Sequence, residues 1–182
     1  AVNPNCMTIA EIYPGISEEA VRVGADVFKM YEVVDVIGHE YSEGEYYASD
    51  REPYDWYNYI IGMHTFRAFA EDKASWMLSY SWLDNKNVTP SDAMKSLFAS
   101  QIFSGTNMWD VEGYVMSSTN DMKTRSEVYK WVSENEDIFY TSRIPLEPIS
   151  VYFSDITRNY FSEEFISSFR GIVSMLMHSH LP

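Results

Sequence analysis

Short apolar runs alternate with amphipathic stretches along almost the whole chain, and this alternation constrains the fold more than any other feature. The runs are rich in β-branched and aromatic residues and cover residues 7–12, 33–38, 75–80, 106–110 and 149–154. After each run, apolar residues recur three or four positions apart, as on one face of a helix. Strands that alternate with helices are typical of parallel α/β architecture.

The helical stretches define how the chain is organised. They cover about residues 17–32, 54–69, 89–103, 122–135 and 162–176, most of them beginning at a capping residue such as Thr89. Pro145 and Pro148 interrupt the pattern and separate four strand–helix units from a fifth. We therefore expect two domains, residues 1–145 and 146–182. An open doubly wound sheet and part of an eight-stranded barrel both fit this periodicity.

The charge of the chain excludes several classes of partner. The formal net charge is −14, because 13 Lys and Arg residues are scattered among 27 Asp and Glu residues. Nucleic acids and anionic membranes are bound by clustered basic residues, so neither is expected as a partner. The apolar stretches are also too short to span a membrane. The composition is typical of a soluble protein, cytoplasmic or secreted, and is compatible with a neutral partner such as a sugar.

Aromatic residues make up 16% of the chain. The rings of Tyr and Trp stack on the apolar C–H faces of sugars, and their polar edges form hydrogen bonds. An aromatic-rich core is the alternative explanation for any single ring. The one cysteine, Cys6, excludes an internal disulfide and is expected to be a small buried hydrophobe beside the first strand.

Polar and aromatic side chains gather where the four expected strands of the first domain end. Ligands bind at the carboxyl ends of strands in barrels and in open α/β sheets alike. The residues at these ends include Glu11, His39, Glu40, Tyr41, Tyr80, Trp82, Trp109, Asp110 and Glu112, and Asn107 lies in the last of these strands. We therefore expect one ligand site that is built from the tips of several strands.

Carboxyl groups in this set suit glycoside hydrolysis, which needs one acid and one nucleophile or base. Glu11 and Glu40, on neighbouring strands, are the first candidates for the catalytic pair. Asp110 and Glu112 are the reserve pair. The alternative for each is a solvated loop carboxylate.

The other tip residues suit recognition of a sugar, by stacking of rings and by hydrogen bonds with hydroxyl groups. The rings are those of Tyr41, Tyr80, Trp82 and Trp109, and the polar groups are those of His39 and Asn107. No glycine-rich phosphate loop, nucleophile elbow or metal-binding histidine spacing occurs in the sequence. We therefore expect no cofactor and no metal.

Four strings, AEIYPG, VDVIGHEYSEG, WMLSYSW and IFSGTNMWDVEG, follow one another in the chain. In this order they resemble the later strand–helix units of glycoside hydrolase barrels, nearest to β-galactosidase-like enzymes related to family 42. PISVYFS and the helix after it are similar to the start of the flavodoxin-like domain that follows such barrels. The resemblance implies that residues 1–145 are the C-terminal half of a TIM-type (β/α)8 barrel. Residues 146–182 would then be the first strand–helix unit of a second domain.

The same resemblance implies an enzyme that cleaves glycosidic bonds in a neutral, galactose-like saccharide, and a chain that is a fragment of a longer one. In that clan a Glu nucleophile ends the seventh strand, whereas the matching position here is Ser79–Tyr80–Ser81. The site would then use Glu40 or Asp110 instead, belong to a different family, or be inactive. A non-catalytic carbohydrate-binding barrel and a plain α/β interaction domain stay open as alternatives. Because half a barrel has open sheet edges, we expect it to pair with another copy or with a missing N-terminal barrel half.

Overall fold

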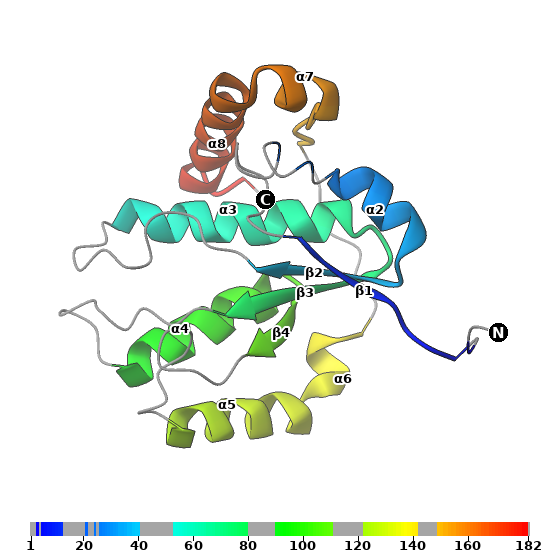
Figure 1. The fold of residues 1–182 in the computed structure, drawn as a ribbon. Coiled ribbons are helices and arrows are strands. Elements are labelled where there is room, and N and C mark those ends of the chain that lie inside the picture. The colour runs from blue at the N-terminus through cyan, green and yellow to red at the C-terminus, as the bar shows by residue number, and fades with distance from the viewer. Residues whose placement is uncertain are drawn as a thin grey trace.

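The computed structural model describes residues 3, 5–12, 21, 24, 26–40, 53–79, 90–110, 122–141 and 149–181. Within these residues four strands alternate with helices, and further helices follow the last strand (Figure 1). The elements are β1 (Ile9–Ile12), α2 (Val27–Val33), β2 (Val36–Glu40), α3 (Pro53–Phe69), β3 (Ala74–Ser79), α4 (Pro90–Phe103), β4 (Asn107–Asp110), α5 (Met122–Glu134), α6 (Glu136–Phe139), α7 (Asp155–Tyr160) and α8 (Ser162–His178).

The four strands form one parallel sheet in the order β1-β2-β3-β4. The expected parallel α/β architecture is therefore confirmed for the first four strand–helix units. β2 begins three residues later than its apolar run, because Val33 still belongs to α2. Thr8 fixes the start of the β1–β2 ladder: its backbone N–H and its hydroxyl donate to Asp35 Oδ2 at 2.8 and 2.7 Å.

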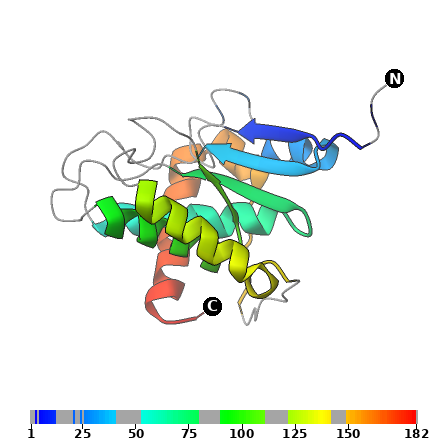
Figure 2. The same cartoon turned by 90° about the horizontal axis from the view of Figure 1, so that it is seen from below.

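The helices that follow the strands form a layer around one side of the sheet. In chain order α2 contacts α3, α3 contacts α4, and α4 contacts α5. In Figure 1 this layer curves from α2 and α3 above the sheet to α4 and α5 below it, and Figure 2 shows α4 and α5 on the side away from β1. Right-handed crossovers between neighbouring parallel strands in sequential order place all their helices on the same side.

The core lies between this helical layer and one face of the sheet. Met77 of β3 packs with Ile61, Met63 and Phe66 of α3, and all four side chains are fully buried. Ile37 of β2 packs in a second cluster under α2. Burial of one such side chain stabilises the fold by roughly 1.5–3 kcal/mol.

Of the helix expected over residues 17–32, Val21 and α2 are helical among the described residues. Gly24 adopts a φ of 74°, which interrupts a right-handed helix, and Asp26 then caps α2 by accepting from the N–H of Lys29 at 3.1 Å. The C-terminal end of α2 is held by Lys73, whose Nζ donates to the carbonyl oxygens of Tyr31 and Val34 at 2.5 and 2.7 Å.

The expected fifth strand, residues 149–154, is wrong, since this segment pairs with no strand of the described residues. Alternate side chains of this segment instead differ in packing: Phe153 is half-buried against other rings, and Tyr152 is 86% exposed. Phe153 lies 5.0 Å from the ring centroid of Phe69 on α3 and 5.1 Å from that of Phe169 on α8. The segment ends at Ser154, whose hydroxyl caps the unexpected helix α7 by accepting from Thr157 N–H.

The C-terminal helices pack on the sheet-bearing part of the chain, because Ile166 and Phe169 of α8 share the core cluster of α3. The division into domains at residues 145 and 146 stays a prediction. Cys6 is exposed, so its expected burial is wrong; it lies in the N-terminal segment that extends away from the sheet (Figure 1). Among the described helices, none has the length and apolar character to cross a bilayer.

Candidate functional site

The side of the sheet turned away from the helical layer carries four of the six expected site residues that the structure describes. Paired residues of parallel strands share a face, and successive residues of one strand alternate between faces. The ladder therefore assigns one set of residues to the face opposite Ile37 and Met77, and we call this set the open face. It comprises Ile9, Glu11, Val36, Gly38, Glu40, Ala74, Trp76, Leu78, Asn107 and Trp109. Neither core cluster of the described residues includes any of them.

The residues of the open face form rows across the strands. Glu11 lies in a row with Gly38, Trp76 and Asn107, and the next row toward the carboxyl ends contains Glu40, Leu78 and Trp109. Glu11 and Glu40 are thus on adjacent strands and two positions apart in register. Strand spacing and rise place their Cα atoms about 8 Å apart.

Gly38 allows the indole of Trp109 to cross the sheet. A Cβ atom on Gly38 would lie 2.9 Å from Trp109 Cζ3 and 3.2 Å from Ile9 Cγ2. The ring therefore reaches from β4 over β3 to β2. Sequence reasoning missed the role of Gly38, although an isolated glycine in a strand pattern is a signal of such a close approach.

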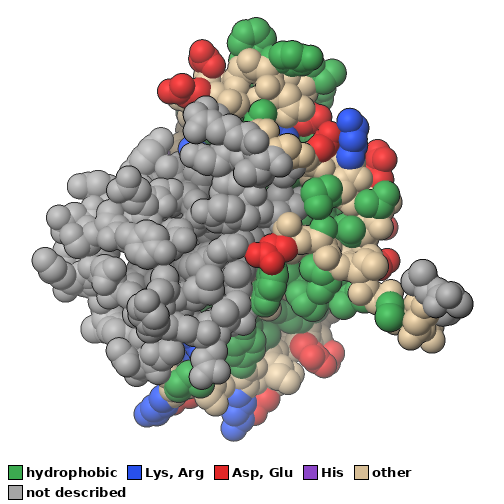
Figure 3. Space-filling view, in the orientation of Figure 1, with side chains coloured by type: hydrophobic (Ala, Val, Ile, Leu, Met, Phe, Trp, Pro, Cys, Tyr) green, Lys and Arg blue, Asp and Glu red, His purple; other side chains and the backbone are tan. Residues whose placement is uncertain are grey.

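The open face combines a carboxylate with aromatic surface. Glu11 is exposed, and Trp76, Asn107 and Trp109 are half-buried. Figure 3 views the molecule as in Figure 1 and shows hydrophobic side chains gathered over the strands. A carboxylate, an amide and indole rings on one surface can contact both the hydroxyl groups and the C–H faces of a sugar.

Not all expected site residues belong to this face. The register places His39 and Asp110 on the face that the helices cover, although both lie at the carboxyl ends of their strands. Tyr41, Tyr80, Trp82 and Glu112 lie outside the described residues. By their register, Glu11, Glu40, Asn107 and Trp109 thus belong to one face of the sheet.

The sequence matches no family model, and no curated protein or solved structure matches it. The site is therefore interpreted from its own geometry. Within the described ranges, no group of three or more His, Cys, Asp and Glu side chains is placed to hold a metal ion.

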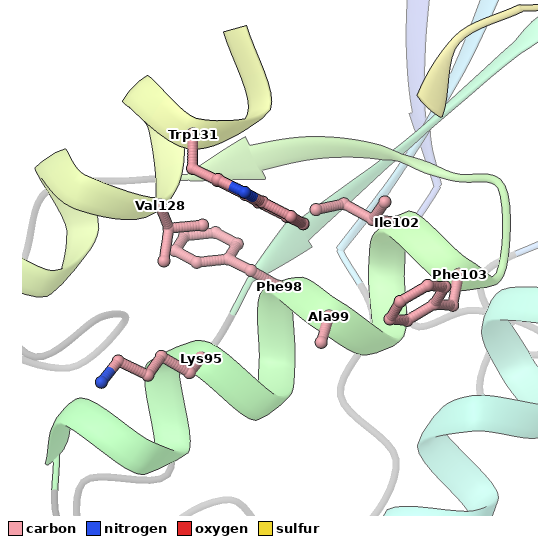
Figure 4. A pocket seen from close by; sticks show the side chains of 7 residues that line it. All are labelled: Lys95, Phe98, Ala99, Ile102, Phe103, Val128 and Trp131. Atoms are coloured by element: carbon pink, nitrogen blue, oxygen red, sulfur yellow. The ribbon is translucent and has the colours of Figure 1, made fainter. Parts of the chain in front are cut away.

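Two cavities lie away from the open face. One, of about 160 Å³, is an apolar seam between α4 and α5, where Trp131 of α5 points toward Ile102 of α4 beside Phe98 and Val128 (Figure 4). Its one charged residue is Lys95. Its lining has no paired carboxyl groups and no acid–base pair, which indicates helix packing rather than chemistry.

The second cavity, of about 540 Å³, lies beside the C-terminal end of α3 and the start of β3. The rings of Phe28, Phe69 and Phe153 line it, together with Tyr31. Burial raises the pKa of the Tyr31 hydroxyl. This cavity is at the amino ends of the strands, which in barrels is the end associated with stability rather than catalysis.

Proposed function

We propose that this chain is half of a (β/α)8 barrel of the glycoside hydrolase type and acts on a neutral saccharide at the open face. The observation that carries the proposal is the sequential parallel order β1-β2-β3-β4 with helices on one side. A doubly wound sheet reverses its strand order at a switch point and has helices on both faces. The four described strands have no such reversal.

Glu11 and Glu40 are the catalytic pair in this proposal. One carboxyl group donates a proton to the glycosidic oxygen as the bond to the anomeric carbon breaks. The other carboxylate attacks that carbon, or removes a proton from the attacking water. Carboxyl groups about 5–9.5 Å apart can perform these roles. Cα atoms about 8 Å apart on adjacent strands allow two glutamate side chains to reach such a separation. Trp109 would stack on the sugar and Asn107 would bind a hydroxyl group.

The test is hydrolysis of a panel of aryl glycosides, including galactosides, by the wild-type chain and by Glu40→Gln and Glu11→Gln. We expect each substitution to lower turnover by about 10²–10⁴-fold, because it removes an acid–base group. Glu32→Gln, at an exposed carboxylate on α2, is the matched control and should leave turnover unchanged. Hydrolysis by the wild type that persists in Glu11→Gln and Glu40→Gln would refute this catalytic pair.

Saccharide binding without hydrolysis is the second candidate. It is favoured by the end of β3 at Ser79, where the resembling enzymes have a Glu nucleophile. In that case the wild type hydrolyses none of the glycosides, yet sugars change its Trp fluorescence. Trp109→Ala should abolish the fluorescence change.

A further inference from the structure

The sheet ends on both sides in strands without a neighbour among the described residues. β1 pairs only with β2, and β4 pairs only with β3. The outward backbone N–H and C=O groups of both strands thus lack ladder partners within this part of the chain. Open edges of this kind are templates for pairing with another chain.

The geometry of the edges fits a second copy of the chain. β1 and β4 are each four residues long and run in the same direction. A two-fold axis parallel to the strands would place β4 of one copy beside β1 of the other, parallel, at two equivalent junctions. The order β1-β2-β3-β4 would then be repeated once, which gives the eight strands of a closed barrel. In Figure 1, α5 lies beyond β4, where it could cover such a junction.

The chain exposes more surface than a compact monomer of its mass. The chain exposes 11057 Å², whereas a compact monomer of its mass, 21.1 kDa, exposes about 9,000 Å². The excess of roughly 2,000 Å² includes the extended N-terminal segment. A standard interface removes only about 800 Å² from each partner, and obligate dimers remove more.

The open face also has the composition of a barrel interior. Ile9 is 43% exposed, and Trp76 and Trp109 are half-buried. Side chains fill the lumen of an eight-stranded barrel, so Ile9 and Trp76 would become more deeply buried on closure, whereas Trp109, in the row nearest the carboxyl ends, would line the mouth where a ligand binds. The burial of Ile9 and Trp76 supplies an apolar driving force that backbone pairing alone lacks.

We propose that two copies of this chain associate along both sheet edges to form one eight-stranded barrel, with the open faces turned inward. The proposal rests on the barrel architecture in the proposed function and not on hydrolysis. Each copy has a formal net charge of −14, so the copies repel one another. Association should therefore strengthen as salt shortens the Debye length.

Sedimentation velocity on the purified chain tests the proposal at concentrations up to about 100 µM and in about 0.05–0.3 M salt. We expect a species of about 42 kDa, twice 21.1 kDa. Its fraction should rise with protein concentration and with salt concentration. Ile9→Lys should weaken the dimer about tenfold or more, because a longer side chain with a charged end would have to fit into the packed, apolar part of the lumen. Ile156→Lys is the matched control, since Ile156 is 72% exposed on α7 and should leave the dimer unchanged.

Energy transfer between donor and acceptor dyes on the single cysteine, Cys6, provides a second measurement on the otherwise unaltered chain. When donor-labelled and acceptor-labelled chains are mixed, energy transfer should appear. Addition of unlabelled chain should reduce this transfer. A wild type that stays at 21.1 kDa over this whole range, or a dimer lost in Ile156→Lys and kept in Ile9→Lys, would overturn the proposal. A dimer without glycosidase activity contradicts only the proposed hydrolysis, and an active monomer contradicts only the dimer.

Discussion

Gly38→Ala tests the close approach of Trp109 to β2, on which the shape of the open face depends. The added methyl group would lie 2.9 Å from Trp109 Cζ3 and 3.2 Å from Ile9 Cγ2. Nonbonded carbon atoms do not approach one another to 2.9 Å, so the indole has to move. Gly38 is buried on β2, which is paired with a strand on each side. The backbone therefore has little freedom to shift instead.

The expected effect is a loss of stability. Forcing an extra methyl group into a packed site costs typically about 1–3 kcal/mol. Replacing glycine with alanine in a strand also stabilises the folded state by about 0.5–1 kcal/mol, because the unfolded chain loses conformational freedom. The free energy of unfolding should therefore fall by about 1–2 kcal/mol, which lowers Tm by roughly 2–8 °C for a chain of this length.

Urea unfolding followed by far-UV circular dichroism measures this change. Gly171→Ala is the control, because Gly171 is an exposed helical position of α8 with no atom within 4 Å of the added methyl group. The free energy of unfolding of that variant should rise by about 0.5–1 kcal/mol, because alanine has a higher helix propensity than glycine. The two substitutions are chemically identical and are expected to change stability in opposite directions.

A double variant separates the contact from other effects. In Trp109→Leu the ring is absent, so adding Gly38→Ala should cost less than it does in the wild type, and the coupling energy should be about 0.5–3 kcal/mol. If Gly38→Ala is as stable as the wild type, or if its cost is the same in both backgrounds, the indole does not lie over Gly38 and the reasoning is refuted.

Three further predictions concern the rest of the fold. Met77→Ala should lower the free energy of unfolding by about 2–5 kcal/mol in a urea titration, since Met77 is fully buried; a change below 1 kcal/mol would contradict its place in the core. The N–H and the hydroxyl of Thr8 hold the pKa of Asp35 below 3.8, so the stability from this carboxylate is fully present above pH 3.8 and is lost as the pH falls through the lowered folded value. The stability difference between wild type and Asp35→Asn should accordingly shrink as the pH falls below about 4, and a pH-independent difference would contradict the assignment. Lys73→Met should destabilise the chain by about 1.5–3 kcal/mol in thermal unfolding, because the carbonyl oxygen of Tyr31 loses a charged donor; Lys29→Met, at an exposed lysine of α2, is its control.

The sequence by itself determined the parts of this protein that depend on neighbouring residues in the chain. The α3 and α4 helices begin and end within a residue of their expected bounds, since helical spacing and a proline at the first position of each are local signals. The parallel α/β class followed from the same alternation. The interruption at Gly24 shows how a single left-handed residue changes the bounds of an expected helix.

Only the tertiary structure decided which strands are neighbours and which side chains share a face. The segment 149–154 has the alternation of a strand, yet its Phe153 packs against Phe69 and Phe169, and no strand of the described residues lies beside it. Periodicity reports that every second side chain is buried, and it does not report what buries it. In the same way, only the ladder places Glu11 in one row with Gly38, Trp76 and Asn107, because the register between strands depends on how the strands pair and not on the sequence of any one strand.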